Sequence, residues 1–182
     1  MATARAVPAP LAHLPNALTV FRLLLIPVYI ALIATADGGR SWPAAIVFGV
    51  AGVTDQIDGF LARRWHVESV FGKIADPLAD RLMINSAVLL LWWADRLPWA
   101  ALAIPARDLL LMVLTPLALK RGYRFEVNLL GKAATWLLYA SLGFLMVTRS
   151  STDWPLWIFW AGFALAIASL LLYLRRAKEV NA

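Results

Sequence analysis

Four aspartates stand in the first half of the chain, in two pairs with helical spacing. Asp55 and Asp58 are three residues apart, and Asp76 and Asp80 are four apart, so on helices the members of each pair share a face. Carboxylates suit a hard cation such as magnesium, and the chain has no cysteine and only 2 histidines to offer instead. Magnesium usually keeps positions open for phosphate oxygens. The acids therefore predict a metal site that handles a phosphate-bearing substrate.

Small residues accompany the acids: Gly59 follows Asp58, Ala62 comes one turn later, and Gly72 precedes Asp76 by one turn. A missing side chain lets a ligand or a neighbouring backbone come close. The alternative is structural, with glycines that pack helices and acids that form a polar cluster. Each residue alone fits that alternative, but their joint spacing favours a substrate site.

The composition is that of a membrane protein. Of the 182 residues, 62% are hydrophobic and 15% are charged, with a mean hydropathy of +0.71, whereas soluble proteins are about half apolar and a quarter charged. An unpaired acid at membrane depth costs about 2.5–3.5 kcal/mol on the insertion scale, so four would oppose folding by roughly 10 kcal/mol. A bound cation would offset this cost.

Six apolar runs are long enough to cross a hydrocarbon core about 30 Å thick. They cover residues 17–36, 43–63, 78–95, 98–119, 129–148 and 155–174. The short gaps between them predict an all-α integral membrane protein, a bundle of six transmembrane helices in one domain with a cytoplasm-facing active-site cavity. Pro77 favours the first turn of the third helix, which would leave Asp76 near its N-cap. The expected divisions are an N-terminal cytoplasmic or interfacial segment (1–15), the six-helix domain (16–176) and a C-terminal tail (177–182).

Lysines and arginines alternate between rich and poor gaps. The rich gaps are those at 63–73 and 120–128 and the C-terminal end, whereas each intervening gap has one arginine. By the positive-inside rule, both termini are cytoplasmic in a multi-pass protein of the bacterial plasma membrane. The net charge of +6 is then explained by lipid headgroups and substrate phosphates, and nucleic acid is not an expected partner.

The acidic segment resembles the signature of the CDP-alcohol phosphotransferases. The matching residues read Asp55-x2-Asp58-Gly59-x2-Ala62-Arg63-x8-Gly72-x3-Asp76-x3-Asp80, with all eight fixed positions present. The stretch from Pro15 to Arg22 is also similar to the N-terminal signature of the bacterial phosphatidyl transferases. The resemblance covers most of the chain, more weakly after about residue 100, and six membrane helices are the family's fold.

This resemblance implies a transferase of phospholipid synthesis that moves a phosphatidyl group from CDP-diacylglycerol to an alcohol and releases CMP. It assigns Asp55, Asp58 and Asp76 to a Mg²⁺ site, with Mn²⁺ as the alternative ion, and makes Asp80 both a shared ligand and the proton acceptor. The implied donor-binding residues are Asn16, Thr19, Gly59, Ala62, Arg63, Ser69 and Gly72. Arg63 would contact phosphate, although an interfacial topology anchor is its structural alternative. The family also implies a homodimer among membrane lipids.

The alcohol acceptor is chosen outside the shared signature. The candidates for binding its phosphate are Arg107, Arg124 and Lys132, with Arg81 facing the same side. Gly131-Lys132 resembles a pair in the glycerophosphate phosphatidyltransferases, which favours glycerol 3-phosphate and a phosphatidylglycerol phosphate product. Arg107-Asp108 departs from their usual Arg-Glu and is also seen in the cardiolipin-synthase branch, whose acceptor is phosphatidylglycerol.

Other functions stay open at this point. Phosphatidylinositol phosphate synthesis is a further alternative within the family, and Arg107-Asp108 alternatively forms a structural ion pair inside the membrane. Buried acids among six spans also occur in ion or metabolite transporters, although the chain has no obvious inverted repeat.

Overall fold

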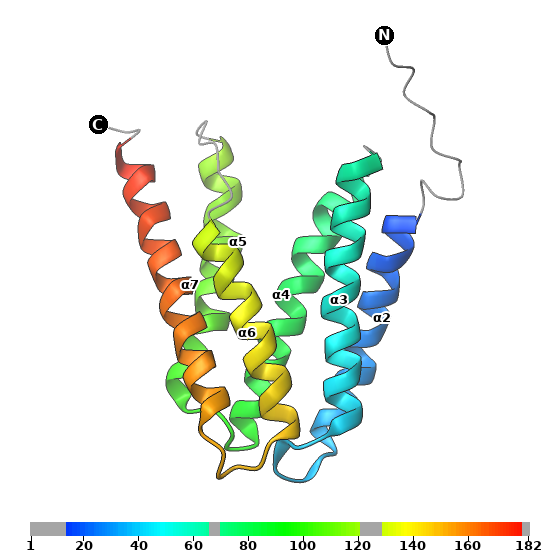
Figure 1. Cartoon of the computed structure of the whole chain (residues 1–182). Coiled ribbons are helices and arrows are strands. Elements are labelled where there is room, and N and C mark those ends of the chain that lie inside the picture. The colour runs from blue at the N-terminus through cyan, green and yellow to red at the C-terminus, as the bar shows by residue number, and fades with distance from the viewer. Residues whose placement is uncertain (1–13, 66–69, 121–128, 180–182) are drawn as a thin grey trace.

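The computed structural model describes residues 14–65, 70–120 and 129–179 (Figure 1). Within these ranges the chain is helical and has no strand, which confirms the all-α prediction. The elements are α2 (Leu14–Ala34), η1 (Asp37–Gly39), α3 (Trp42–Trp65), α4 (Val70–Trp93), η2 (Trp99–Leu102), α5 (Ala103–Lys120), α6 (Leu129–Val147) and α7 (Trp154–Glu179).

The helices run up and down and form one bundle (Figure 1). Helix α2 packs along α3 and α4, and α6 packs along α7. Helix α6 also contacts α3 and α4, so it joins the two halves of the bundle. The connections α2–α3, α4–α5 and α6–α7 lie at the lower end in Figure 1, and the start of α2 and the end of α7 lie at the other.

Three helical segments among the described residues are long and apolar enough to cross a membrane: Asn16–Ala34, Leu129–Val147 and Trp154–Leu172. They belong to α2, α6 and α7. The other three long helices contain the four signature acids and Arg107-Asp108, whereas Lys132 lies in α6. In α3 the apolar stretch ends at Asp55, and α5 carries Arg107-Asp108 in its second turn. Buried charge therefore shortens the apolar runs of the helices that hold the candidate site.

The start of the third long helix was predicted wrongly. Helix α4 begins at Val70, eight residues before the expected 78, so Asp76 lies inside the helix and not at its N-cap. Lys73 and the acids lower the hydropathy of this segment, and the apolar run therefore starts later than the helix. Pro77 lies within α4, where it cannot donate the usual hydrogen bond to the carbonyl of Lys73. Proline is tolerated at such positions in membrane helices when neighbouring groups satisfy the backbone.

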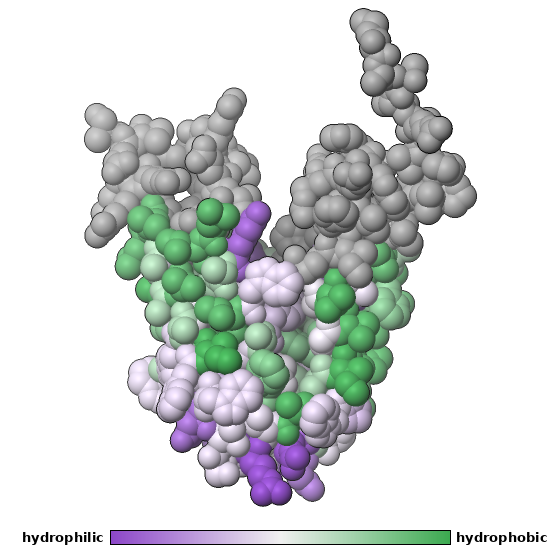
Figure 2. Space-filling model, in the orientation of Figure 1, coloured by the Kyte–Doolittle hydropathy of each residue, from purple (hydrophilic) through white to green (hydrophobic). Residues whose placement is uncertain are grey.

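Large apolar side chains cover the outside of the bundle, as the green band in Figure 2 shows. Leu24, Ile46 and Leu109 are 64%, 61% and 65% exposed, a pattern typical of lipid-facing surfaces. Five of the six exposed tryptophans among the described residues lie at the lower end, where α3 begins, α4 ends and α7 begins and in η2: Trp42, Trp93, Trp99, Trp154 and Trp157. The sixth, Trp136, lies within α6. Tryptophans at one level of a bundle are typical of a membrane–water interface.

Two arginines cap the C-terminus of α6 at this lower end. Arg40 Nε donates to the carbonyl of Val147 at 2.9 Å, and Arg96 Nη2 donates to the carbonyl of Thr148 at 3.0 Å. The last carbonyls of a helix have no partner within it, so these contacts satisfy acceptors that would otherwise be unpaired. Burial, together with the nearby Arg40, lowers the pKa of Arg96 from its ordinary value.

The turn between α2 and α3 depends on a glycine. Gly39 has φ +65° and lies against the connection that follows α4. A Cβ on Gly39 would lie 2.7 Å from Ala94 Cβ and 3.3 Å from Arg96 Cγ. Gly38 also has positive φ, +55°, but has no atom within 4 Å of the corresponding position. Substitutions at the two glycines therefore allow the cost of a side chain at positive φ to be distinguished from the cost of a steric clash.

We expect Gly39→Ala to lower the thermal unfolding temperature more than Gly38→Ala. Both substitutions place a side chain at positive φ, which costs about 1–2 kcal/mol, but only Gly39→Ala also overpacks the turn, at roughly 1–3 kcal/mol more. Thermal unfolding in one detergent at one scan rate measures the difference. The double variant Gly39→Ala/Ala94→Gly should regain part of the loss. Equal losses for the two single variants would contradict the steric explanation.

Candidate active site

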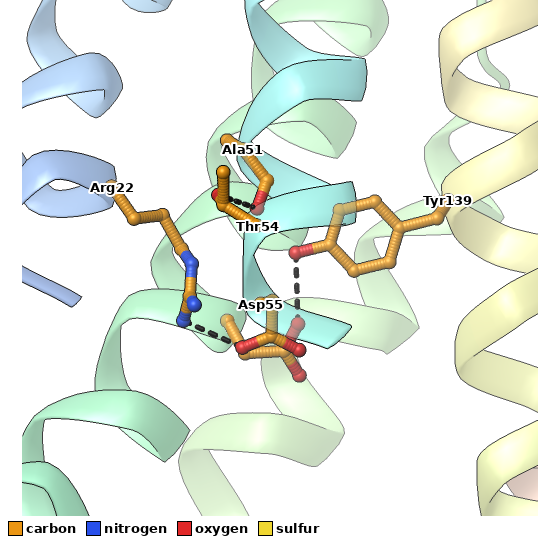
Figure 3. Close-up of polar contacts among 6 residues, drawn as sticks. Arg22, Ala51, Thr54, Asp55 and Tyr139 are labelled. Carbon is orange, nitrogen blue, oxygen red and sulfur yellow. Dashed lines mark hydrogen bonds and ion pairs between the residues drawn. The ribbon is translucent and has the colours of Figure 1, made fainter. Parts of the chain in front are cut away.

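An ion pair joins α2 to α3 in the interior. Arg22 Nη1 lies 2.5 Å from Asp55 Oδ1, and the arginine side chain is fully buried while that of Asp55 is 21% exposed (Figure 3). Arg22 belongs to a buried stripe along one face of α2 that also contains Thr19, Ile26 and Tyr29. Its cationic group therefore reaches Asp55 from within an apolar surface. Removing one partner of such a pair leaves an uncompensated buried charge, which typically costs 3–5 kcal/mol.

A second contact joins α6 to α4. The hydroxyl of Tyr139 donates a hydrogen bond of 2.8 Å to Asp80 Oδ1, drawn dashed in Figure 3. The two residues are 59 positions apart in the chain. Asp55 and Arg22 both lie within electrostatic range of the same Tyr139 hydroxyl. Four helices thus bring an arginine, two acids and a tyrosine to one place in the bundle.

The helix directions arrange the four motif acids in two levels. Helix α3 runs away from the lower end and α4 returns toward it, so the backbones of Asp58 and Asp76 both lie one turn beyond Asp55 and Asp80 (Figure 1). One turn corresponds to about 4.5–6 Å for three or four residues. Asp55 stands 13 residues after Trp42, about 20 Å above the tryptophan level. The acids therefore lie in the half of the bundle nearer the chain termini.

A polar group on α4 and α5 lies next to Asp80. Asp108 is buried beside the amide of Asn85, and Arg107 Nη1 lies 3.3 Å from Asp108 Oδ1. Arg81 lies within electrostatic range of Asp80, Asp108 and Arg107. Because Arg107 and Asp108 are neighbours in one helix, their ion pair does not itself join two helices. Among the described residues Arg107 Nε has no hydrogen-bond partner.

The remaining predicted residues divide by how far the structure describes them. Asn16 is half-buried and Thr19 is buried in the first turns of α2, on the side of the helix that carries Arg22. Asp58, Gly59, Ala62 and Arg63 lie in α3, and Gly72 and Asp76 lie in α4, with only their backbones described. Ser69 and Arg124 lie outside the described residues.

Lys132 is exposed in the first turn of α6. Its neighbour Gly131 has a packing role, because a Cβ there would lie 3.1 Å from Ser169 Oγ on α7. Helix packing therefore explains the glycine of the Gly131-Lys132 pair, but it does not explain the lysine.

Two residues of the site were not predicted as such. Arg22 carries the only charge between Asn16 and Ala36, and a lone ionisable residue inside an apolar span is a signal for a functional site. Tyr139 offers no comparable signal, since a tyrosine in an apolar run usually reflects packing or an interface. Only the contact between α6 and α4 identifies it.

The described side chains provide part of a metal site. Asp55 and Asp80 offer hard oxygen ligands, but no group of three or more acids or histidines able to hold an ion occurs among the described side chains. Asp58 and Asp76, whose side chains are not described, occupy the adjoining turns of the same helices. The donor chemistry of the four acids fits a hard divalent cation.

The comparisons with known proteins agree with this geometry. Residues 12–168 match the family model of the CDP-alcohol phosphatidyltransferases. A CMP-forming cardiolipin synthase of Streptomyces coelicolor is 38% identical over 76% of this chain and 66% of its own length. CDP-diacylglycerol–glycerol-3-phosphate 3-phosphatidyltransferases of Bacillus subtilis and Escherichia coli are 34% and 32% identical, over 80% and 89% of this chain and 86% and 89% of their own lengths. This chain belongs to the CDP-alcohol phosphatidyltransferase family.

Proposed function

We propose that this protein transfers a phosphatidyl group from CDP-diacylglycerol to an alcohol and releases CMP. One observation carries the proposal. Asp55 and Asp80, on the antiparallel helices α3 and α4 of the family signature, lie close together beside Arg22 and Tyr139. The names of the relatives support the donor and the leaving group. Membership of a transferase family favours an enzyme over the transporter alternative.

Asp80 is the proposed general base. Its carboxylate takes the proton of the acceptor hydroxyl, while the hydroxyl oxygen forms a bond to the phosphorus that bears the diacylglycerol group. The bond from that phosphorus to the bridging oxygen breaks, and the electron pair leaves with CMP. Asn16, Thr19, Gly59, Ala62, Arg63, Ser69 and Gly72 are the proposed donor-binding residues.

A divalent cation, Mg²⁺ with Mn²⁺ as the alternative, is proposed to bind Asp55, Asp58, Asp76 and Asp80. The chemistry of the acids supports it: Asp55 and Asp80 lie close together in the bundle, and Asp58 and Asp76 occupy the adjoining turns of the same two helices. Carboxylate oxygens are the ligands that a hard divalent cation prefers. When bound, such an ion polarises phosphate oxygens and takes up charge on the leaving nucleotide.

For the acceptor we propose glycerol 3-phosphate, which would give phosphatidylglycerol phosphate. Lys132, Arg107 and Arg124 are the proposed phosphate-binding residues. Arg107 supports this choice, because its Nε is unpartnered among the described residues and can donate to an incoming oxygen. Cardiolipin synthesis from phosphatidylglycerol is the second candidate, favoured by the Arg107-Asp108 pair and by the Streptomyces relative.

In the membrane we propose six spanning helices, with both termini and an active-site cavity on the cytoplasmic side. The tryptophans at the opposite end and the position of the acids nearer the termini support this orientation. The proposed setting is a homodimer in a bacterial plasma membrane. The proposed divisions of the chain remain 1–15, 16–176 and 177–182.

The function is tested with purified protein in mixed micelles. We expect CMP release from CDP-diacylglycerol that requires both an alcohol acceptor and Mg²⁺ or Mn²⁺. Asp80→Asn should lower the transfer rate by a factor on the order of 10²–10⁴, because an amide cannot remove the proton of the attacking hydroxyl. Donor binding, followed by equilibrium dialysis, should fall much less. Asp37→Asn, at the opposite end of the bundle, is the matched control and should behave as wild type. Failure of wild type to release CMP would refute the proposal.

The metal is tested separately through stability. Arg22→Met removes the positive charge beside Asp55, so a cation at the acids should bind this variant more tightly than wild type. Added Mg²⁺ should therefore raise the thermal unfolding temperature of Arg22→Met by more than that of wild type. Arg40→Met is the control, because Arg40 caps α6 far from the acids. Equal Mg²⁺ responses in all three proteins would contradict a cation next to Asp55.

The acceptor is tested with Lys132→Ala. A charge-assisted hydrogen bond contributes roughly 1.5–3 kcal/mol to binding. Loss of Lys132 should therefore raise the Michaelis constant for glycerol 3-phosphate about 10- to 100-fold. Donor binding should stay nearly constant. Phosphatidylglycerol presents its phosphate with apolar tails that supply much of the binding, so its use should depend less on Lys132. Conversion of phosphatidylglycerol to cardiolipin, with no response to glycerol 3-phosphate, would replace the first choice with the second.

A further inference from the structure

Asp80 accepts a side-chain hydrogen bond from a neutral group, the hydroxyl of Tyr139. The donor comes from α6, whereas the signature acids lie on α3 and α4. The bond of 2.8 Å engages Oδ1 and leaves Oδ2 for another partner. A carboxylate held at one oxygen cannot turn freely, so its second oxygen has a defined direction.

The Tyr139 ring is itself held in place. A Cβ on Gly52 would lie 3.2 Å from both Cδ1 and Cε1 of the ring, so α3 offers a gap here that the ring fills. On another side Phe48 packs against the ring with centroids 5.1 Å apart. Gly52 is three residues before Asp55, so the same face of α3 seats the tyrosine and presents an acid. The hydroxyl is thus directed at Asp80 by the packing of its ring.

Tyr29 provides an internal comparison. It is fully buried and also packs against Phe48, with ring centroids 5.4 Å apart. Its hydroxyl has no hydrogen-bond partner among the described residues. The two tyrosines therefore belong to one aromatic stack, but only Tyr139 makes a polar contact with a signature acid.

We propose that Tyr139 is a positioning residue for the proposed general base. It holds Asp80 through Oδ1 so that Oδ2 faces the acceptor hydroxyl and receives its proton. This inference rests on the proposed function, because it assigns Tyr139 a part in the same proton transfer. Tyr139 does not touch the substrate and does not itself exchange the proton.

Tyr139→Phe tests the proposal because it removes the hydroxyl and keeps the ring. Loss of a partner that orients a reacting group typically costs tenfold to a hundredfold, so we expect kcat for CMP release to fall by about that factor. The Michaelis constant for CDP-diacylglycerol should stay close to wild type, whereas the unfolding temperature should fall modestly, because Asp80 loses a hydrogen-bond donor. Tyr29→Phe, the same chemical change one ring away, should leave kcat unchanged.

Gly52→Ala provides a second route to the same contact. Its Cβ must displace the Tyr139 ring by a few tenths of an ångström, so kcat should fall while the hydroxyl is still present. If Gly52 acts through the tyrosine, the double variant Gly52→Ala/Tyr139→Phe should lose less than the product of the two single losses. This comparison of folded variants distinguishes positioning from general destabilisation, and Gly52→Ala alone carries the test if Tyr139→Phe does not fold.

The outcomes separate this inference from the function on which it rests. A wild-type enzyme that releases CMP, together with a Tyr139→Phe variant of unchanged kcat, overturns only the positioning role. A fall in kcat matched by Tyr29→Phe, or one caused by weaker donor binding, also overturns it. Wild-type protein that releases no CMP overturns both proposals.

Discussion

Carboxylates placed deep in an apolar bundle must have partners, and the arrangement of this protein follows from how those partners are supplied. Asp55 receives a cation from α2, and Asp80 receives a hydroxyl from α6. An acid left without compensation at this depth would cost several kcal/mol, so each contact constrains where a flanking helix can lie. Helices α2 and α6 both pack against α3 and α4.

The two acids are compensated in chemically different ways. Arg22 neutralises Asp55 with a full positive charge, whereas Tyr139 stabilises Asp80 with a neutral hydrogen bond. This difference is consistent with the proposed role of Asp80 in proton transfer, since its hydrogen-bond donor is a neutral group from another helix.

The two ends of the bundle also differ. At the end away from the chain termini, the glycine turn after α2 packs against the connection after α4, and Arg40 and Arg96 cap α6. These contacts fix the lower ends of α3, α4 and α6 relative to one another. The acids lie on the same three-helix framework, about 20 Å above the level of Trp42. A rigid base is what a site needs when its groups come from several helices.

Much of this protein could be predicted from its sequence alone. Apolar runs of sufficient length specify helices, and the spacing of Asp55, Asp58, Asp76 and Asp80 is a local property that a single helix turn converts into a shared face. The start of α4 was missed because hydropathy marks the apolar part of a helix and not its polar first turns. The partners of the acids depended on tertiary structure. Arg22 is 33 residues from Asp55, and Tyr139 is 59 residues from Asp80, so no local periodicity relates them. Within a helix that is apolar on every side, the sequence does not show which face is buried, and only the packing of α2 and α6 on α3 and α4 brings these two side chains to the acids.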